Sequence, residues 1–378
     1  MLPPGPREPP ALQTIEWIVR PTALLRRAAA TYGEPFTLRT AWSDAPLVLT
    51  SDPEEIKRVY AAPADVLEGG DSSAFLEPFV GRNSILILKG SEHLRRRRQL
   101  LPPFHGEALK RWTATIRETA HAELDTWVPG KPMKALPRMQ ALTLEVIQRV
   151  IFGSRDPELR DALRAPLDMT GSTWRLIAMS LVKAGPPYTR FVRAVEHLDE
   201  LIYDRIDRGG DGIVDLLTGT REEKRDQLVT LLAAGHETTA TALAWALERL
   251  ARHPTELETD EQIDAFVREV LRTRPVLSIT ARRVLQPYRL GGYTLPPGVY
   301  VAPCIYLAHR RGDTFIPFGG GVRRCLGAPF ATLEMREVLR AVAARFTLVP
   351  EREEGERMRR RSVTLAPARG ASIIPLTR

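Results

Sequence analysis

The chain has 378 residues, of which 43% are hydrophobic and 26% are charged, and these ordinary proportions exclude a disordered chain or a collagen-like repeat. The only two cysteines, Cys304 and Cys325, exclude a disulfide framework and a zinc ribbon, and a reducing cytoplasm is the expected compartment. The net charge of +8 allows an acidic protein partner, nucleic acid or an anionic membrane surface without selecting one of them.

The first half of the chain predicts a small β-prone region among helices. We expect residues 1–15 to be irregular, without the features of a secretory leader, and residues 16–33 to form a helix. A β-rich part is expected over residues 34–60, where Ser51 to Glu55 caps a further helix. The glycine- and serine-rich residues 66–90 predict a long loop. Further helices are expected from Ser91 and over residues 106–128, 138–152, 157–184 and 188–207.

The second half contains the longest predicted helix, residues 222–252, whose centre is apolar on almost every side and is typical of a helix that crosses a protein's interior. The remaining expected elements are a helix over 260–273, short strands within 276–303 with a turn at 296–298, a helix over 325–346 and a β hairpin over 362–376. No apolar run reaches the roughly 18 residues that a membrane span needs. The pattern predicts one α+β, mainly α, domain of residues 1–378.

The segment Phe318–Gly327 reads FGGGVRRCLG and has the strongest chemical character in the chain. Three consecutive glycines allow the backbone to approach something flat and bulky. Cys325 precedes a predicted helix and follows Arg323 and Arg324, so the helix dipole and two positive charges predict a lowered thiol pKa. From Cys325 alone, a buried structural cysteine beside a glycine turn is an equally good interpretation.

This decapeptide resembles the haem-binding loop of the cytochromes P450, whose pattern FxxGxRxCxG is filled by Phe318, Gly321, Arg323, Cys325 and Gly327. The resemblance implies a cytochrome P450 fold, a haem b cofactor and Cys325 as the thiolate ligand of the iron. It also implies that Arg323 contacts a haem propionate and that Phe318 packs beside the sulfur. A thiolate ligand pushes electron density onto iron and favours O–O cleavage.

A second motif, AGHETT over residues 234–239, interrupts the long apolar helix with an acid and two hydroxyls. Such residues are unfavourable in mid-helix and need partners or a wet cavity when buried. Gly235 is expected to make room for a ligand, although a bent helix with threonine bonded to a carbonyl is an alternative. The stretch resembles the family's acid–alcohol motif, which implies that Glu237 and Thr238 relay protons to bound dioxygen; His236 receives no role.

Three weaker motifs gain meaning from the same resemblance. Glu269 and Arg272 lie on one helix face and resemble the ExxR pair that braces the haem-side core. His93 and Arg97, four residues apart, resemble a pair that holds a propionate. Arg282 is the favoured further propionate ligand, and its neighbour Arg283 is the close second choice.

The family pattern is broken after residues 308–311, where an irregular segment called the meander, with a third arginine, is expected and residues 312–318 follow at once. That arginine is missing unless Arg310 or Arg311 replaces it. The stretches 218–224 and 254–260 also look short. Trimmed surface loops, which loop-closure entropy tolerates, and residues omitted from the supplied chain are alternative explanations.

The resemblance implies a monooxygenase that inserts one oxygen atom of dioxygen into a lipophilic small molecule, using electrons from a separate ferredoxin or flavodoxin. We expect a cytoplasmic monomer without nucleic acid or a membrane anchor. An exposed basic face at Arg95, Arg96 and Arg98 is expected to attract an acidic donor. A non-catalytic haem-binding scaffold, a basic nucleic-acid-binding protein and a peroxide-driven enzyme are the alternatives.

The expected substrate pocket is apolar and admits fatty acids, terpenes, steroids or polyketides. Its expected lining residues are Phe75, Leu76, Trp174, Ile177, Leu231, Val276, Leu277 and Ile279. Cys304 is expected in the core. His105, His121, His197, His253 and His309 have no ligand-like spacing.

Overall fold

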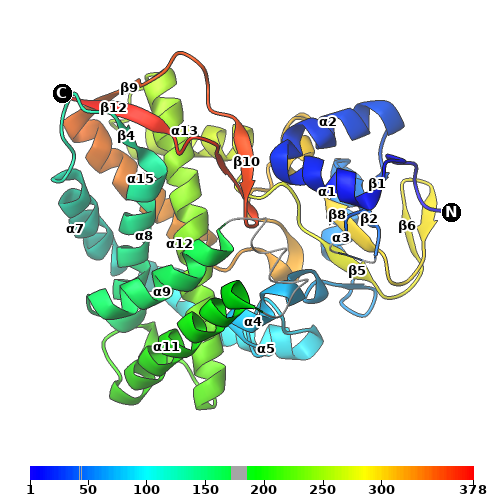
Figure 1. Cartoon of the computed structure of the whole chain (residues 1–378), viewed down its shortest axis with the longest axis horizontal. Coiled ribbons are helices and arrows are strands. Elements are labelled where there is room, and N and C mark those ends of the chain that lie inside the picture. Colours follow the sequence, from blue (N-terminus) through cyan, green and yellow to red (C-terminus); the bar gives the residue numbers. More distant parts are fainter. Residues whose placement is uncertain (42, 44, 172–184) are drawn as a thin grey trace.

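The computed structural model describes residues 1–41, 43, 45–171 and 185–378. Most of the long helices gather on one side of the molecule, while the first two helices and the largest sheet lie on the other (Figure 1). The expected α+β, mainly α, class is confirmed. The helices of the described residues are α1 Pro10–Val19, α2 Pro21–Tyr32, α3 Pro53–Ala61, α4 Glu77–Val80, α5 Gly90–Leu100, α6 Glu107–Lys110, α7 Trp112–Leu124, α8 Ala135–Phe152, α9 Pro157–Thr170, α11 Pro186–Arg208, α12 Arg221–Arg252, α13 Asp260–Thr273, α14 Ile305–Ala308 and α15 Ala328–Arg345, with short 3₁₀ turns η1 Asp71–Leu76, η2 Pro102–Phe104, η3 Ile213–Leu216 and η4 Gly321–Arg323.

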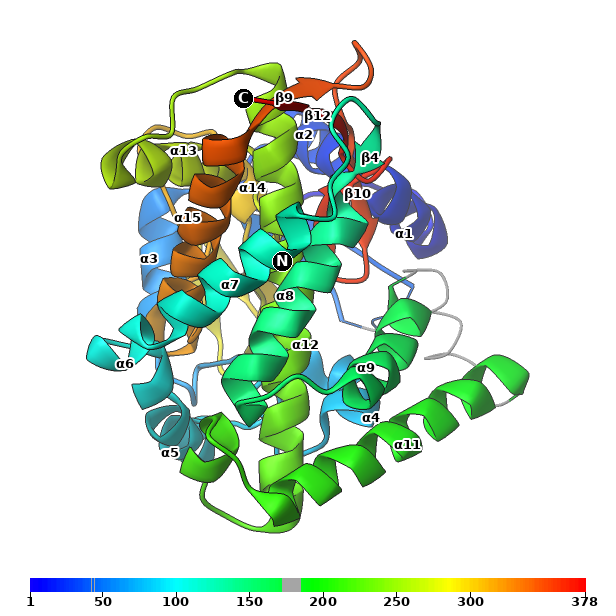
Figure 2. The ribbon, with the colours of Figure 1, turned by 90° about the vertical axis from the view of Figure 1, so that its left-hand side faces the viewer.

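Helix α12 crosses the helical side of the molecule, with α8 packed along it and α15 on another face (Figure 2). It begins with a capping box, in which Thr220 and Glu223 each accept the other's backbone N–H. The buried Trp245 indole donates to the Leu365 carbonyl oxygen at 2.7 Å and ties α12 to the C-terminal strands. The predicted central helix is confirmed.

The largest sheet has the order β1-β2-β8-β5-β3 and joins segments far apart in the chain. Strand β2 pairs in parallel with β8, Leu47 opposite Tyr300, while β3 pairs antiparallel with β5, Glu68 opposite Arg283. The expected β-rich part over residues 34–60 supplies β1 and β2, and the expected short strands within 276–303 supply β5 and β8, while β3 lies in the segment 66–90 that was expected to be a loop. The strands are β1 Phe36–Leu38, β2 Leu47–Thr50, β3 Leu67–Glu68, β4 Met133–Lys134, β5 Arg282–Val284, β6 Tyr288–Leu290, β7 Tyr293–Leu295, β8 Tyr300–Pro303, β9 Phe346–Pro350, β10 Met358–Arg361, β11 Thr364–Pro367 and β12 Ser372–Thr377.

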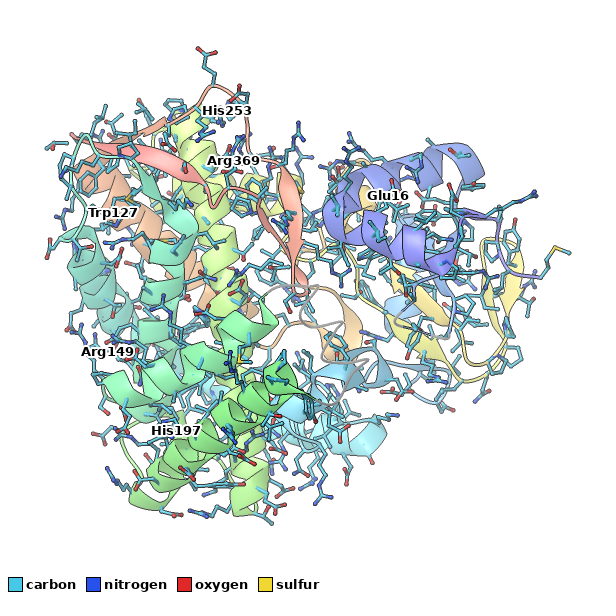
Figure 3. The ribbon with its side chains drawn as sticks, in the orientation of Figure 1. Glu16, Trp127, Arg149, His197, His253 and Arg369 are labelled. Carbon is cyan, nitrogen blue, oxygen red and sulfur yellow. The ribbon has the colours of Figure 1, made fainter. Side chains whose placement is uncertain are left out.

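The first helical segment differs from its prediction. Helix α1 already begins at Pro10, and Pro21 starts α2 in place of a continuous helix over 16–33. Proline fits the first position of a helix, where its missing N–H is not needed, and it ends a preceding helix for the same reason. Glu16 on α1 pairs with Arg27 on α2 and holds the two helices together (Figure 3).

Several other boundaries also differ from the predictions. The expected loop over 66–90 contains β3, η1 and α4, and the expected helix over 106–128 is divided into α6 and α7. Helix α9 ends at Thr170, and the rest of the helix predicted over 157–184 lies in residues 172–184, outside the described residues. Short polar or glycine-rich segments depend on tertiary contacts, so periodicity alone does not fix their ends.

The C-terminal hairpin lies earlier in the chain than residues 362–376. Strands β10 and β11 form it, with Met358 opposite Pro367 and a turn that places Ser362 at a φ of 51°. Strand β12 pairs instead with β9 and β4. The prediction was wrong because it paired neighbouring strands, whereas β12 finds more distant partners in the sequence. None of the described helices is both long and apolar enough to cross a membrane.

Candidate active site

Cys325 ends a loop directly before α15, and its backbone N–H donates to the Phe318 carbonyl oxygen at 2.9 Å. Solvent reaches the side chain, yet protein surrounds the thiol closely enough for burial to raise its pKa. Both observations hold if the thiol lines a recess rather than the outer surface. In contrast, Cys304 is fully buried and burial raises its pKa to about 12, as expected for a core cysteine.

The expected lowering of the Cys325 pKa is wrong for the chain by itself. Burial is the largest cause and raises the pKa, while the Gly327 N–H and the charges of Arg97 and Arg324 lower it less. Low polarity disfavours the thiolate more than these groups favour it. Because a metal-bound thiol is deprotonated outright, coordination would reverse this balance.

The flat group that the glycines of the loop approach is Tyr60, at the end of α3. A Cβ atom on Gly320 would lie 2.3 Å from Tyr60 Cδ2, and one on Gly321 would lie 2.1 Å from the Tyr60 carbonyl oxygen. Gly321 also has a φ of 65°, which side chains disfavour. The Tyr60 hydroxyl lies 2.9 Å from Thr280 Oγ1. Sequence reasoning missed Tyr60, because nothing local links it to the loop.

A cluster of basic side chains brings together the four residues expected to hold propionates. His93 on α5 is only 3% exposed, and its pKa is lowered to about 4 by burial and then by the charges of Arg323, Arg97 and Arg282. These three guanidiniums come from the loop, α5 and β5, so the fold places them around one imidazole. We call His93, Arg97, Arg282 and Arg323 the basic cluster.

Sequence reasoning missed the carboxylate that enters this cluster. Glu68, at the end of β3, is 4% exposed, and its Oε1 accepts from Arg323 Nη2 at 3.0 Å. Gly69 lies under both guanidiniums, since a Cβ there would meet Arg323 Cδ at 2.5 Å and Arg282 Nη1 at 3.2 Å. The sequence segment around Glu68 reads as a loop, so no pattern marks this residue.

The basic run on α5 is only partly exposed. Arg95 and Arg98 face solvent, but Arg96 is 2% exposed, so its expected place on the basic surface is wrong. Arg96 Nη2 lies 2.6 Å from Glu223 Oε1, which connects α5 to the capping box of α12. Outside the basic cluster, Arg283 lies 3.7 Å from Asp71.

The acid–alcohol motif lies on α12, but its groups face different ways. Thr238 Oγ1 donates to the Ala234 carbonyl oxygen at 2.7 Å, and Ala234 is exposed although it lies in the middle of a core helix. The Ala234 and Thr238 face therefore borders a solvent-reached space. The expectation for Gly235 is wrong: a Cβ there would lie 3.0 Å from Ile147 of α8, so this glycine serves helix packing.

Glu237 is held by groups from two other elements. Arg361 Nε on β10 donates to Oε1 at 2.8 Å, and Gln140 Nε2 on α8 donates to Oε2 at 2.8 Å. The neighbouring His236 packs against α8, with Nδ1 3.0 Å from Thr143 Oγ1, and burial lowers its pKa to about 3. The carboxylate is therefore fixed in this state.

Glu269 and Arg272 form the expected pair, with both Arg272 Nε and Nη2 2.7 Å from the carboxylate. His309, which the sequence left without a role, joins this region to the shortened segment. Its Nδ1 lies 3.2 Å from the Arg272 carbonyl oxygen, and its Nε2 accepts the Ile316 N–H at 2.9 Å. Neutral imidazole with its proton on Nδ1 satisfies both contacts.

The third arginine of the expected network has no replacement among the described residues. Arg310 packs over the Tyr306 ring at 3.7 Å, and Arg311 lies 3.7 Å from Glu34 instead of Glu269. Phe315 instead packs beside His309 and beneath the guanidinium of Arg268 on α13. The short connection is thus closed by aromatic contacts.

The expected pocket residues are divided between two core clusters. Leu76, Leu231 and Val276 are partly buried against the large core cluster of the helical side, to which Phe318 and Leu326 also belong. Ile279 instead packs against the cluster around α1 and α2, and Phe75 is 44% exposed. Leu277 is half-buried, while Trp174 and Ile177 lie outside the described residues.

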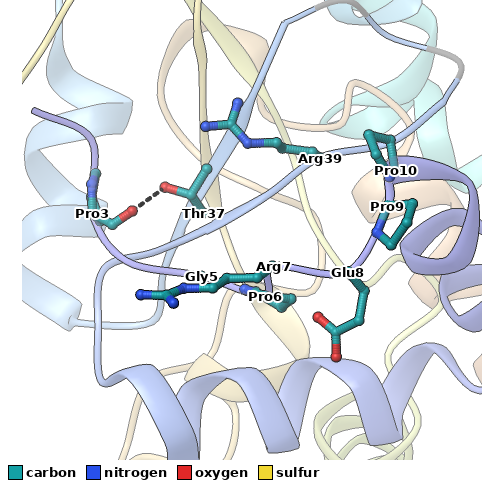
Figure 4. Close-up of a pocket in the computed structure, with 9 residues that line it drawn as sticks. All are labelled: Pro3, Gly5, Pro6, Arg7, Glu8, Pro9, Pro10, Thr37 and Arg39. Carbon is teal, nitrogen blue, oxygen red and sulfur yellow. Dashed lines mark hydrogen bonds between the residues drawn. The ribbon is translucent and has the colours of Figure 1, made fainter.

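A separate hollow of about 390 Å³ lies at the N-terminus, away from this chemistry (Figure 4). The extended residues 3–10 border it opposite Thr37 and Arg39, and Thr37 Oγ1 donates to the Pro3 carbonyl oxygen at 2.7 Å. The Thr37 N–H also donates to the Pro4 carbonyl oxygen at 2.9 Å, which holds the first residues against β1.

Comparisons with known proteins test the family resemblance that the sequence indicates. The family model described as "Cytochrome P450" matches residues 3–259, 261–315 and 308–374. The chain belongs to the cytochrome P450 family. The match is interrupted at residue 260 and its last two segments overlap over residues 308–315, which are two of the places where the family pattern is broken.

Relatives of this cytochrome P450 include one named provisionally as cytochrome P450 135B1 in Mycobacterium tuberculosis, 36% identical over 98% of the chain and 91% of the relative. That alignment runs over 433 positions, at least 55 more than the chain has residues, so gaps lie within this chain. The structure titled "Retinoic acid bound cyanobacterial CYP120A1" matches with a TM-score of 0.83 and 18% identity, covering 100% of this chain and 99% of that chain. CYP175A1 from Thermus thermophilus matches with a TM-score of 0.78 and 28% identity, covering 94% of this chain and 95% of that chain.

Haem b is the cofactor of this family, and the residues present fit it. The accessible thiol of Cys325 offers a ligand for the iron. The guanidiniums of the basic cluster offer bidentate partners for carboxylates, and the Gly69 backbone beneath two of them leaves no side chain in the way.

Proposed function

We propose that this cytochrome P450 inserts one oxygen atom of dioxygen into a lipophilic small molecule, most simply by C–H hydroxylation. The observation that carries the proposal is the solvent-reached Cys325 thiol beside Arg97 of the basic cluster. When bound, haem b supplies the redox centre at which dioxygen is reduced and split. Cys325 would hold the iron as a thiolate, while His93, Arg97, Arg282 and Arg323 would hold the propionates.

The proton-handling groups are Thr238 and Glu237. Since the Thr238 hydroxyl donates to Ala234, its lone pairs are left to accept a hydrogen bond from a water on the accessible face. Glu237 must leave Arg361 or Gln140 before it can reach that face. Proton delivery on this helix would therefore need a side-chain movement of Glu237.

The expected pocket residues and the cysteine count support a class of substrate and a class of electron donor. The expected lining residues Leu76, Leu231 and Val276 are apolar and partly buried, which favours an apolar substrate because burial of apolar surface would be its main gain on binding. Two cysteines are too few for an iron–sulfur cluster in addition to the haem ligand. We therefore propose a separate ferredoxin or flavodoxin as the electron donor, approaching the exposed Arg95 and Arg98.

The carbon-monoxide difference spectrum of the dithionite-reduced protein tests the proposal. We expect the strongly red-shifted Soret band of a thiolate ligand, and its loss in Cys325→His. Cys304→Ser is the matched control and is expected to keep the band, since Cys304 is fully buried elsewhere. A spectrum of neutral-thiol or histidine ligation in the wild type, or no haem, would leave a non-catalytic scaffold.

A further inference from the structure

Glu68 is a buried carboxylate that the proposed chemistry does not use. It ends the edge strand β3, next to β5, which begins at Arg282. Its Oε1 accepts the Gly70 N–H at 2.6 Å and Arg323 Nη2 at 3.0 Å, while Oε2 accepts the Asp71 N–H at 3.0 Å. Two backbone donors therefore fix the carboxylate, and the fixed carboxylate fixes the guanidinium.

Arg323 depends on this partner. Its side chain is 12% exposed, and its other acceptors are the carbonyl oxygens of Leu86 and Leu88. Among the described residues, Glu68 is its only carboxylate within 4 Å. Removing one member of a buried ion pair leaves the other charge buried without compensation. This destabilises a protein far more than the loss of an exposed ion pair does.

Glu68 also lowers the net charge of the region around the basic cluster. Arg97 and Arg282 form no ion pair within 4 Å in the part of the chain that the structure describes. His93 has a pKa of about 4 and is neutral near pH 7. The three guanidiniums of the basic cluster thus carry three positive charges, and the carboxylate of Glu68 carries one negative charge. Two propionates would neutralise the remaining two positive charges.

We propose that Glu68 is a positioning residue of the haem site: it holds the Arg323 guanidinium in place and reduces the charge of the basic cluster to match two propionates. This inference rests on the proposed haem ligation. It assigns to a residue outside the recognised loop the task of orienting one propionate partner, and it explains why a carboxylate lies beside groups that must attract carboxylates.

The reduction potential of the holoenzyme tests the charge. Glu68→Gln removes a negative charge from the basic cluster that would hold the haem, so the ferrous form is stabilised relative to the ferric form and the reduction potential rises above that of the wild type. Glu248→Gln is the matched control, because Glu248 is similarly buried and paired with Arg249 and Arg252 near the end of α12. The control is expected to leave the potential unchanged. An unchanged potential in Glu68→Gln would overturn the charge argument.

Haem transfer to excess apomyoglobin tests the positioning. We expect Glu68→Gln to lose haem several-fold faster than the wild type. In the Arg323→Gln background the same change should give no further acceleration, because no guanidinium remains to be held. Equal acceleration in both backgrounds, or slower loss in Glu68→Gln alone, would overturn the positioning role.

Glu68→Asp separates the two effects and covers a Gln variant that fails to fold. Asp keeps the charge but is one methylene shorter, so the potential should stay near the wild-type value while haem loss accelerates. A wild type that lacks the thiolate spectrum would refute the proposed ligation itself. A wild type with that spectrum, whose Glu68 variants match Glu248→Gln in potential and haem loss, would refute only the role of Glu68.

Discussion

Two residues, one in the loop before Cys325 and one on α12, have roles that only the three-dimensional structure reveals. Gly320 has an extended backbone, which any residue could adopt, yet a Cβ there would lie 2.3 Å from the Tyr60 ring. Thr238 donates to its own helix and keeps only acceptor capacity on its accessible side. In both cases the chemistry of the residue is ordinary, and its neighbour gives it a role.

Gly320→Ala is expected to destabilise the protein by about 1–3 kcal/mol, because the added methyl group overpacks the contact with Tyr60. Urea unfolding of the holoenzyme measures the free energy of unfolding. Gly355→Ala is the matched control, since a Cβ at Gly355 would meet nothing within 4 Å. Equal stability of the two variants would contradict the role given to Tyr60.

Thr238→Ala is expected to release several-fold more of the consumed dioxygen as hydrogen peroxide, because the acceptor that orders water beside the site is lost. The measurement compares peroxide formed with dioxygen consumed, using whichever fatty acid, terpene or steroid the wild type oxidises. Thr238→Ser keeps the hydroxyl and should restore coupling. If Thr238→Ala stays as well coupled as the wild type, the proton role is wrong.

At the scale of elements, α5 and α12 meet where Arg96 reaches the capping box of α12. The capped ends of α12 and α13 were close to the predicted boundaries, because Thr220 and Thr259 are local features of the sequence. The β12 partners could not be predicted, since pairing with β9 and β4 depends on the whole fold.

The candidate site shows the same division between local patterns, which can be predicted from the sequence, and contacts between distant segments, which cannot. The Cys325 loop and the Glu269–Arg272 pair are short local patterns, so the sequence located them. Glu68 and Tyr60 reach the site from segments more than 200 residues away in the chain, and neither has a motif of its own. Burial raises the pKa of Cys325, whereas the sequence predicted a lowered pKa. The neighbouring residues in the sequence do not reveal how deeply a thiol is buried.

Arg96→Ala is expected to cost about 2 kcal/mol of unfolding free energy, because it removes a charge-assisted hydrogen bond between a buried guanidinium and Glu223. Arg95→Ala is a close control: Arg95 is 56% exposed and 3.8 Å from the same carboxylate, so a loss within about 1 kcal/mol is expected. Thermal or urea unfolding of both variants decides the point. A similar loss in the two variants would show that burial of Arg96 contributes little.

At the scale of the whole molecule, α5 and the Cys325 loop both carry exposed positive charge. Arg95 and Arg98 are exposed on α5, and Arg324 is exposed beside Cys325, whose thiolate it favours. Neighbouring positive charges raise the rate at which an acidic protein arrives. Because Arg97 of α5 lies close enough to favour the Cys325 thiolate, we propose that a donor of opposite charge is guided to α5 and this loop.

The double variant Arg95→Glu/Arg98→Glu is expected to slow reduction by an acidic ferredoxin several-fold at low salt, with the difference shrinking as salt screens the charges. Stopped-flow reduction under carbon monoxide measures the rate. Arg352→Glu is the control, because its loop between β9 and β10 lies at the opposite end of the molecule from α5 (Figure 1). Equal rates for all three proteins would place the donor elsewhere.

Three buried histidines make the stability of the whole molecule depend on pH. Burial lowers the pKa of His93 and His309 to about 4 and that of His236 to about 3, below the ordinary 6.5. Between these values the unfolded chain binds protons that the folded chain does not. Their contribution to stability is therefore complete above about pH 6.5 and is lost as pH falls toward 4.

The variant His309→Gln measures the contribution of His309 to the pH dependence of the unfolding free energy. Between pH 7 and pH 5, the wild type should lose about 2 kcal/mol of unfolding free energy through His309, and the variant should lack that part of the slope. The slope, measured by urea unfolding at several pH values, is informative even though the variant also loses the contacts to Arg272 and Ile316. His253→Gln, at the exposed surface near the end of α12, is expected to keep the wild-type slope (Figure 3). An unaltered slope in His309→Gln would mean that this imidazole takes up a proton without opening the short connection between α14 and the Cys325 loop.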